Sequence, residues 1–348
     1  MRIAIVTDAW HPQVSGVVTT YSETVSRLRQ RGQEVLTVTP AEFRTVPCPS
    51  YPGIPLALFP GREVHRRLTA FRPDSIHIAT EGPLGWAARA FCLRQGLGFT
   101  TAYHTRFPEY VQLRLPLPLS LLYRVVRRFH APAVRTMVAT DDLHQELAAR
   151  GFGHLCRWSR GVDTELFRPR DKDFLSGARP IAMYMGRVAV EKNIEAFLRL
   201  ELPGTKYVVG DGPAREGLER RYPAVRFVGT KRGEELARHL AAADLFVFPS
   251  RTDTFGVVLL EALACGVPVA AYPVTGPRQV VREGVNGYLD ENLGRAARRA
   301  LTLDANRCRQ SVLAFSWEAC TDQFCENLYR IAPAGQDIPA LAWSPSNR

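Results

Sequence analysis

Residues 250–268 read SRTDTFGVVLLEALACGVP, and they follow the apolar, β-prone run DLFVFP at 244–249. An apolar run, a small-residue turn and a second apolar run predict a strand, a loop and a helix in that order. We expect the helix to begin near Gly256, which leaves the backbone N–H groups around Phe255 and Val257 free at its N-terminus. Such a terminus attracts oxyanions and hydroxyl-rich ligands.

The same stretch holds two carboxylates eight positions apart, Asp253 and Glu261. A carboxylate accepts hydrogen bonds from pairs of hydroxyls, so one acid suits a sugar and the other a ribose. The alternative is an ordinary helix start, in which Asp253 caps the helix and Glu261 is solvated. For an isolated pair of acids this alternative is favoured, because short motifs often match by chance. The rest of the chain has to decide between the two.

The size and composition are those of a two-domain globular protein. The chain has 348 residues, of which 46% are hydrophobic and 23% are charged. No run approaches the ~20 apolar residues that span a bilayer. The start, MRIAIVTDAW, resembles a first strand more than a secretion signal, because Asp8 interrupts it. Seven cysteines form no C-x-x-C pair, which favours a reduced, cytoplasmic protein without a cysteine metal site.

The net charge of +11 is unevenly spread. The first 165 residues hold 20 arginines, no lysine and 13 acidic residues, a net charge of +7. A basic domain suits nucleic acid, anionic lipid or a phosphorylated substrate. Nucleic acid is disfavoured here, because the chain shows neither a basic stripe interleaved with aromatic residues nor a recognised reader motif.

Each half of the chain begins with an apolar strand and a glycine-containing turn. Residues 2–7 lead through Gly16 into a helix that ends near Gly32, and residues 180–185 lead through Gly186 towards a helix from about Asn193. Further strands are expected at 35–39, 75–79, 100–104, 137–140, 206–210, 225–228, 245–249 and 268–272. Strands that alternate with helices predict the α/β class, with a doubly wound parallel sheet in each half and a cleft between the two sheets.

We therefore divide the chain into two domains with a linker and two terminal pieces. The first domain is expected at 1–165, a polar linker at 166–179 and the second domain at 180–315. A helix is expected at 316–331. Residues 332–348 are rich in Pro, Ala and Ser and are expected to form a frayed tail.

Several loops are candidates for holding a phosphorylated ligand. Arg187 and Lys192 follow the first strand of the second half, where a planar guanidinium and a point charge suit a diphosphate. Gly16 and Gly186 allow a ligand to approach the backbone, and the backbone at Val228 is a candidate for contacting a base edge. The alternatives are surface cations and purely conformational glycines. The turn at Gly16 is not the G-x-G-x-x-G of a dinucleotide fold, which disfavours a nicotinamide enzyme.

The loops of the first half supply candidates for a sugar acceptor. His104 lies at the end of a predicted strand and is a candidate donor to a sugar hydroxyl or a proton carrier. A structural histidine is the alternative. The acceptor-side candidates that surround it in the sequence are Asp8, Trp10, Arg106, Glu109 and Tyr110.

Two further regions bear on metal and membrane. Asp141 and Asp142 are expected at a helix start, where acids favour the helix dipole. We expect no required metal. Residues 113–129 mix large apolar residues with arginines, and from Leu119 they predict a helix with Leu122, Val125, Val126 and Phe129 on one side. This helix suits an anionic membrane surface, and a core-facing helix with a solvated basic face is equally favoured.

Taken jointly, these residues resemble glycosyltransferase family 4, the retaining enzymes of GT-B fold. The resemblance covers about residues 2–330 and is carried by SGV, YHTRFPEY, GRVAVEKN, VGDGP and SRTDTFGVVLLEALACGVPVAA. Bacterial mannosyltransferases and plant-type sulfolipid and galactolipid synthases are the most similar members. The resemblance implies two facing Rossmann-like domains, the first for the acceptor and the second for a nucleotide sugar. It also implies a last helix, SWEACTDQFCENLY, that crosses back to the first domain.

The resemblance implies a role for each matching residue. Gly16 would face the donor phosphate and His104 the transferred sugar. Arg187 and Lys192 would hold the diphosphate. Asp253 would bind sugar hydroxyls and Glu261 the ribose. Asp253 stands where the family more often has Glu, which shortens its reach by one methylene and leaves the donor sugar open.

The implied activity is that of a hexosyltransferase that keeps the anomeric configuration. The departing phosphate oxygen would assist deprotonation of the acceptor hydroxyl, and the cations would stabilise its charge. No cofactor or metal is implied, since the nucleotide sugar is a substrate. The expected acceptor is a lipid or lipid-linked hydroxyl, with the protein peripheral on the inner face of the cytoplasmic membrane. GDP-mannose is the leading donor, ahead of UDP-linked glucose, glucuronate or sulfoquinovose.

Other classes remain as alternatives. A phosphorylase on a similar fold would need a Schiff-base lysine, of which the chain offers few candidates. A sugar-nucleotide epimerase would be expected to lack the lipid-facing character of 113–129. A non-catalytic sugar-nucleotide sensor would bind the donor without turning it over when an acceptor is supplied.

Overall fold

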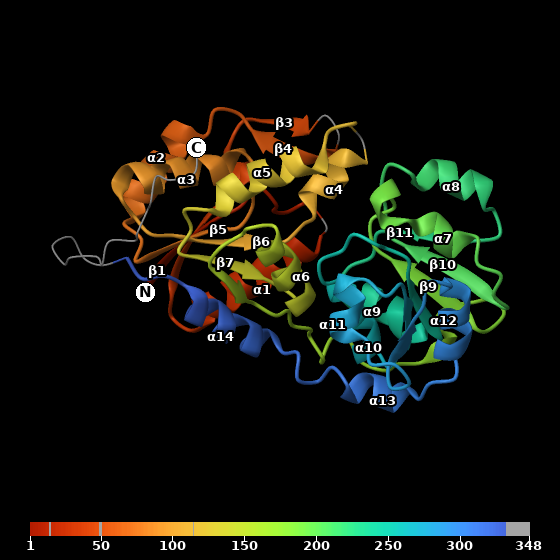
Figure 1. Ribbon diagram of the computed structural model, residues 1–348. Helices are drawn as coiled ribbons and strands as arrows, with labels where there is room; N and C mark the ends of the chain where they lie inside the picture. The colour runs from red at the N-terminus through yellow and green to blue at the C-terminus, as the bar shows by residue number, and fades with distance from the viewer. Residues whose placement is uncertain (14, 49–50, 114, 332–348) are drawn as a thin grey trace.

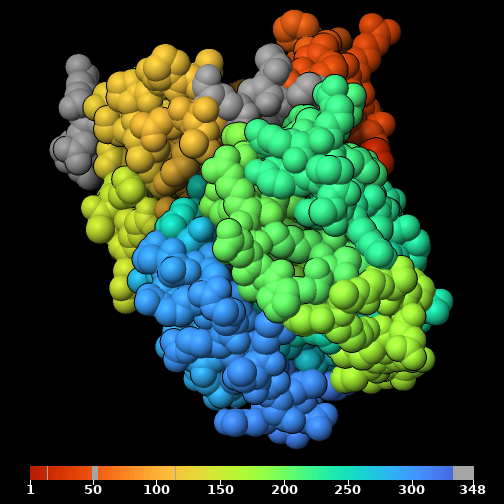
Figure 2. Space-filling model, turned by 90° about the vertical axis from the view of Figure 1, so that its right-hand side faces the viewer, coloured from red at the N-terminus to blue at the C-terminus, as the bar shows by residue number. Residues whose placement is uncertain are grey.

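Two lobes lie side by side, and each is built around one parallel sheet (Figure 1). The computed structural model describes residues 1–13, 15–48, 51–113 and 115–331. The tail expected at 332–348 lies outside these residues. Seen from the side of the second lobe, the green and blue surface of that lobe fills most of the visible face, with part of the first lobe rising above it (Figure 2).

The first sheet has six parallel strands, and the apolar residues of its four inner strands are buried on both faces, as covered parallel strands require. Their order across the sheet is β2 (Glu34–Val38), β1 (Arg2–Val6), β5 (Ser75–Ile78), β6 (Thr100–Tyr103), β7 (Arg135–Val138) and β8 (Leu155–Arg157). The chain runs outward in one direction from β1 to β2 and in the other from β5 to β8. The switch point therefore lies between β1 and β5.

The described part of this lobe has six helices, and an antiparallel hairpin lies outside its sheet. The helices are α1 (Gly16–Gln30), α2 (Gly61–Phe71), α3 (Pro83–Gln95), α4 (Phe107–Gln112), α5 (Leu119–His130) and α6 (Asp141–Ala149). The hairpin pairs β3 (Thr45–Cys48) with β4 (Tyr51–Ala57), and a 3-10 turn, Pro40–Glu42, precedes it.

The second sheet repeats this plan. Its order is β11 (Arg226–Gly229), β10 (Thr205–Val209), β9 (Ile181–Met185), β12 (Leu245–Phe248), β13 (Val269–Ala271) and β14 (Gly287–Leu289), all parallel. The switch point lies between β9 and β12. The helices are α7 (Ile194–Leu198), α8 (Arg215–Arg221), α9 (Gly233–Ala242), α10 (Val257–Ala264), α11 (Thr275–Val280), α12 (Leu293–Ala300) and α13 (Ala305–Gln310), with 3-10 turns at Lys172–Phe174 and Val190–Lys192.

The last helix, α14 (Trp317–Asn327), leaves the second lobe and packs beside α1 of the first (Figure 1). Ser316 caps it by accepting a hydrogen bond from the Ala319 N–H at 3.0 Å. Trp317, Cys320, Thr321 and Phe324 are buried, which is the face that helical spacing predicts. Two ion pairs, Arg27–Glu318 and Arg31–Asp322, join it to α1.

The expected fold class is confirmed: two doubly wound parallel sheets and a helix that crosses back. Each strand expected from an apolar run is present, with ends that differ by one or two residues. The strands β3, β4, β8 and β14 were not expected. The division at 1–165, 166–179 and 180–315 stays a prediction in its detailed bounds.

Helix α5 begins at Leu119 as expected, but its buried face differs from the expected one. Val126 and Phe129 are buried together with Tyr123 and His130. Val125, expected on the same side, is 50% exposed. Tyr123 lies on the buried side because it precedes Val126 by three residues, which is nearly one helical turn. Val125 is rotated about 100° around the helix axis from Val126 and therefore lies on another side.

Candidate functional site

The switch point of the second sheet brings the predicted donor-binding loops together. Gly186 and Arg187 follow β9, and the segment with Asp253 follows β12. Parallel strands place their carboxyl ends at one edge of the sheet, where ligands of doubly wound proteins bind. The loops of the first lobe that carry Gly16 and His104 follow β1 and β6. The two lobes meet at these loops, as the contacts below show.

Two helix N-termini face each other across the junction of the lobes. A side chain at Gly16, the first residue of α1, would lie 3.6 Å from Val257 Cγ2, the first residue of α10. Ser15 caps α1 by accepting a hydrogen bond from Val18 N–H. Gly256 precedes α10 with a φ of 84°, which favours glycine, and no side chain of the described residues caps α10. The free N–H groups of α10 therefore remain available to an anion.

Lys192 and Asp253 form an ion pair, although 61 positions separate them. Burial alone would lower the pKa of Lys192, but the attraction of Asp253 outweighs it and raises that pKa above the usual value. Asp253 Oδ1 accepts the hydrogen bond from Lys192, while the buried Oδ2 has no partner among the described residues. An unpaired buried carboxylate oxygen suits a hydroxyl donor. Lys192 lies in the 3-10 turn Val190–Lys192, just before α7.

Glu261 lies on α10, one turn after the helix start. Burial raises the pKa of its carboxyl to about 7. No described side chain donates a hydrogen bond to it. A carboxyl that stands without a partner at this pKa is ready to accept hydrogen bonds from ligand hydroxyls.

The neighbourhood of Lys192 includes two tyrosines from different lobes. Tyr184 at the end of β9 donates a hydrogen bond to the Arg187 carbonyl at 2.7 Å and interacts electrostatically with Lys192 and Asp253. Tyr110 of α4 also acts electrostatically on Lys192. Arg187 is half-buried. The predicted acceptor-side Tyr110 therefore meets the predicted donor-side cation.

Two more predicted donor-side residues have ordinary structural surroundings. Phe255 is buried in the core of the second lobe. Val228 is half-buried in β11, the edge strand on the other side of β10 from β9. Their roles towards a donor stay predictions.

His104 is buried, and both of its ring nitrogens have partners inside the first lobe. Its Nδ1 lies 2.9 Å from a guanidinium nitrogen of Arg160, and its Nε2 lies 2.7 Å from the hydroxyl of Tyr21. Burial and the positive charge of Arg160 lower the pKa of His104 far below its usual value. The backbone of His104 faces the second lobe, because its carbonyl accepts a hydrogen bond from Thr254 Oγ1 at 2.5 Å.

Arg106 and Glu109 connect elements rather than point into open space. Arg106 forms a two-pronged ion pair with Glu146 of α6 and donates to Thr275 Oγ1 of α11 at 2.9 Å. Glu109 Oε1 accepts from the Tyr123 hydroxyl at 2.6 Å, while its buried Oε2 has no partner within the described chain. Arg106 thus holds α4, α6 and the second lobe in one place, beside a carboxylate oxygen that is free to accept.

Asp8 has the contacts of a helix cap. Its two carboxylate oxygens accept hydrogen bonds from Leu84 N–H at 2.8 Å, Gly85 N–H at 3.2 Å and Thr80 Oγ1 at 2.8 Å, all at the start of α3. Burial raises its pKa to about 6 against these bonds. Asp8 is therefore hydrogen-bonded within the first lobe, and its expected acceptor-side role stays a prediction. Trp10 packs edge-on against His11 in the loop before α1.

Four residues of this region were not predicted from the sequence: Tyr21, His77, Arg160 and Thr254. Thr254 lies inside the stretch 250–268, and the other three lie outside the motifs considered above. Arg160 precedes the Gly161-Val162-Asp163 turn, and Tyr21 is an inward residue of an amphipathic helix. Only their spatial meeting around His104 identifies them.

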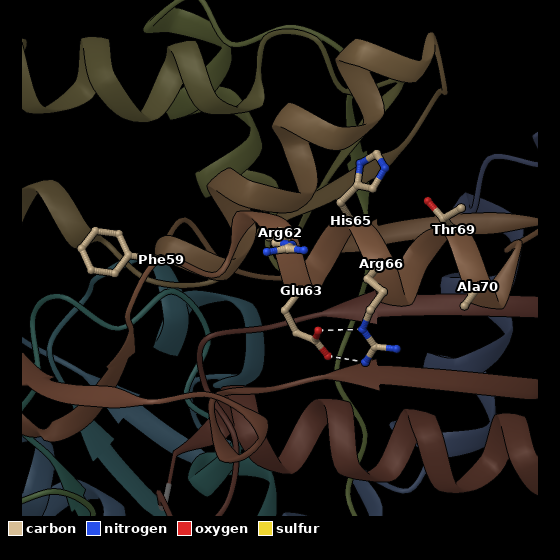
Figure 3. Close-up of a pocket in the computed structure, with 7 residues that line it drawn as sticks. All are labelled: Phe59, Arg62, Glu63, His65, Arg66, Thr69 and Ala70. Carbon is tan, nitrogen blue, oxygen red and sulfur yellow. Dashed lines mark hydrogen bonds and ion pairs between the residues drawn. The ribbon is translucent and has the colours of Figure 1, made fainter.

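The structure adds findings on metals, membrane spans and surface hollows. Among the described residues no three His, Cys, Asp or Glu side chains gather as metal ligands, and no described helix is both long and apolar enough to cross a bilayer. A surface hollow lies over α2, where Glu63 pairs with Arg66 (Figure 3). It contains none of the predicted site residues.

Comparisons with known proteins agree with this geometry. The family described as "Glycosyltransferase Family 4" matches residues 14–166, and "Glycosyl transferases group 1" matches 179–303.

A sulfoquinovosyl transferase of Arabidopsis thaliana is 32% identical over 79% of this chain, which spans only 61% of that relative's length. A GDP-mannose-dependent alpha-mannosyltransferase of Corynebacterium glutamicum is 30% identical over 99% of this chain and 93% of its own. Sucrose-phosphate synthase of Thermosynechococcus elongatus superposes with a TM-score of 0.73 at 23% identity, covering 93% of this chain and 97% of that one. The chain thus belongs to glycosyltransferase family 4 and is a glycosyltransferase of GT-B fold.

Proposed function

We propose that this glycosyltransferase moves a hexose, mannose from GDP-mannose as the leading case, to a hydroxyl of a lipid or lipid-linked acceptor. The observation that carries the proposal is the group at the β9–β12 switch point. It combines two cations, Arg187 and Lys192, with a carboxylate oxygen of Asp253 that has no partner among the described residues. A diphosphate and a neighbouring sugar need this combination of charge and acceptor.

The donor would lie between the facing starts of α1 and α10. The backbone of Gly16, which carries no side chain, would approach the phosphate, and the N–H groups after Gly256 would donate to it. Asp253 Oδ2 would accept from a sugar hydroxyl, and Glu261 would accept from the ribose. Phe255, Val257 and Val228 would line this donor position through their backbones.

In the transfer step the bond between the anomeric carbon and the diphosphate oxygen breaks, and a bond to the acceptor oxygen forms on the same face. The acceptor proton passes to the departing diphosphate oxygen. Arg187 and Lys192 would stabilise the negative charge that develops there, so the reaction needs no metal. Contact between the lobes would exclude water.

The surface of α4 and α5 supports the proposed lipid acceptor and the proposed contact with a membrane. Apolar side chains there are exposed: Phe107, Leu113, Leu115, Leu117, Leu121 and Val125. The exposed arginines Arg124, Arg127 and Arg128 accompany them. Apolar side chains beside cations suit an anionic lipid surface, which would place the protein at the inner face of the cytoplasmic membrane. Glu109 and Tyr110 of α4 would then lie between this surface and the donor.

The similarity to a GDP-mannose-dependent enzyme favours GDP-mannose, and the similarity to a sulfoquinovosyl transferase supports a UDP-sugar as the second candidate. Thermal unfolding with GDP, UDP, GDP-mannose and UDP-sugars tests the choice. A ligand at 100 times its dissociation constant stabilises by about 2.7 kcal/mol. Stabilisation by guanine compounds alone supports a mannosyltransferase, and stabilisation by uracil compounds alone supports the alternative. No shift with any of them would contradict the donor site.

Turnover separates a transferase from a binding protein. Labelled donor incubated with detergent-dispersed lipid should give labelled lipid, with the anomeric configuration kept, and a chelator should not reduce the yield. Donor that binds but is never transferred would contradict catalysis. Loss of activity in chelator would contradict independence from metal.

A further inference from the structure

A continuous chain of hydrogen bonds runs through the interior of the first lobe and passes through His104. Arg160 contacts His104 Nδ1 at 2.9 Å, and His104 Nε2 contacts the Tyr21 hydroxyl at 2.7 Å. The same hydroxyl lies 2.7 Å from His77 Nε2, and His77 Nδ1 lies 2.9 Å from Thr100 Oγ1. All five side chains are buried.

The direction of every bond in this chain follows from its first member. A guanidinium only donates, so His104 Nδ1 must be the acceptor and carries no hydrogen. The hydrogen of His104 therefore sits on Nε2 and is donated to the Tyr21 oxygen. Tyr21 in turn donates to His77 Nε2, which leaves the hydrogen of His77 on Nδ1, facing Thr100. The two histidines are thus held as opposite tautomers.

Burial and nearby basic groups oppose the protonation of His104. Arg160 faces it from the loop after β8, His77 from β5 and His130 from α5, and each lowers its pKa in addition to burial. Tyr21 of α1 and the ring of Trp158, 5.6 Å away, complete the surroundings. Glu81 and Cys320 lie near enough to act on Tyr21, but they make no hydrogen bond to the His104 ring. A second ring hydrogen on Nδ1 would point at the Arg160 guanidinium.

The backbone of His104 links this interior chain to the donor site. Its carbonyl accepts from Thr254, the residue after Asp253, and Asp253 holds Lys192. Arg160 and Tyr21 hold the ring of His104, and this also holds its backbone carbonyl in place for the hydrogen bond from Thr254. A ring that moved would shift the carbonyl and, with it, the loop that carries Asp253.

We propose that Arg160 and Tyr21 are positioning residues that hold His104 as a neutral ring with its hydrogen on Nε2, so that His104 anchors the Asp253 loop instead of carrying a proton. This replaces proton transfer, one of the two roles expected of His104 from the sequence. Its effect on transfer rests on the proposed function, whereas the tautomer does not.

The tautomer is measured without any substrate, by long-range proton–nitrogen NMR correlation on protein labelled with ¹⁵N-histidine. Between about pH 5 and 8, where exposed histidines titrate, the rings of His104 and His77 should stay unchanged, the first with its hydrogen on Nε2 and the second with its hydrogen on Nδ1. The first signal should disappear in His104→Asn and the second in His77→Asn. A His104 ring that titrates in this range, or that carries its hydrogen on Nδ1, would overturn the proposal even if the protein is a transferase.

The link to activity is tested with Arg160→Met and a matched control, Arg89→Met. Arg89 likewise donates to two backbone carbonyls and lies over a tryptophan ring, but it has no histidine partner. Arg160→Met should mix the tautomers of His104 and lower turnover at least tenfold. Arg160→Lys should restore part of the Nε2–H tautomer and part of the turnover. Arg89→Met should keep the spectrum and the turnover. An unchanged tautomer and turnover in Arg160→Met would contradict the proposal, and if that variant fails to fold, the wild-type spectrum alone decides.

Discussion

At the scale of single residues, the two acids of the donor loop have different surroundings and therefore different tasks. Asp253 is charged and bound to Lys192, with one oxygen left over. Glu261 has no ion-pair partner among the described side chains, and burial keeps its pKa near neutral. In the proposed function, the first arrangement would couple recognition of the sugar to the cation that holds the diphosphate. The second would make recognition of the ribose dependent on pH.

Lys192→Ala is expected to lower turnover by about 100-fold or more, the usual loss when a group that stabilises developing charge is removed. It also leaves Asp253 partly buried without its counter-ion, so the melting temperature should fall. Initial rates and thermal unfolding measure both effects. Lys206→Ala serves as the control, since the hydrogen bonds of Lys206 within the described chain go to the Leu198 and Leu200 carbonyls. Near-normal turnover in Lys192→Ala would remove Lys192 from the diphosphate site.

The raised pKa of Glu261 predicts a pH-dependent affinity for the nucleotide. In the free protein the carboxyl is protonated below about pH 7. Ribose hydroxyls donate to the ionised form and lower this pKa, so binding releases a proton and affinity rises with pH through 7. Below that pKa, each decrease of one pH unit should raise the dissociation constant by up to about tenfold. Calorimetric titration with GDP at several pH values measures it, and Glu261→Gln should bind weakly with no such slope.

At the scale of elements, much of the fold could be predicted because parallel strands are short apolar runs that end in turns. β9 and β12 are examples, and their loops carry predicted donor residues. The missed strands lack that signal. β3 and β4 contain prolines, which are rare in sheet interiors, and β8 and β14 have three residues each.

Site residues could be predicted from the sequence only where a motif lies at the end of a single helix or strand. Asp253 and Glu261 flank the start of α10, so their position followed from the helix. The capping role of Asp8 depends on α3, 75 residues further on, and the meeting of Arg160 with His104 depends on how three elements pack. A single sequence shows the local order of residues but not such distant pairs.

Helix α14 gives a prediction at this scale. A side chain at Gly161 would lie 2.6 Å from the Trp317 backbone at the start of α14. Gly161→Ala should therefore displace the helix and destabilise the protein by about 1–3 kcal/mol, measured by urea unfolding. Gly153→Ala is the matched control, because its added methyl would meet nothing within 4 Å. Equal stability of the two variants would show that α14 does not hold its described position in solution.

At the scale of the whole molecule, the lobes touch through few but specific polar contacts. Thr254 binds the His104 carbonyl, Arg106 binds Thr275, and the Asp142–Arg278 ion pair measures 3.8 Å. These contacts join α4 and α6 of the first lobe to α11 and the Asp253 loop of the second. A donor between the lobes would thus touch elements that already hold each other. The proposed acceptor would then arrive along α4 and α5, where the exposed apolar side chains lie.

That direction of approach predicts which surface meets lipid. Leu121→Asp places a charge among the exposed apolar side chains of α5, where Leu121 is 44% exposed. Loss of one buried apolar side chain from the lipid contact should weaken binding about tenfold. The measurement is flotation with phosphatidylcholine vesicles that contain phosphatidylglycerol. Leu313→Asp is the matched control, since Leu313 is 47% exposed but lies between α13 and α14, away from this surface. Equal flotation of both variants would show that α5 does not contact the membrane. Turnover on a water-soluble acceptor would then be expected to exceed turnover on lipid.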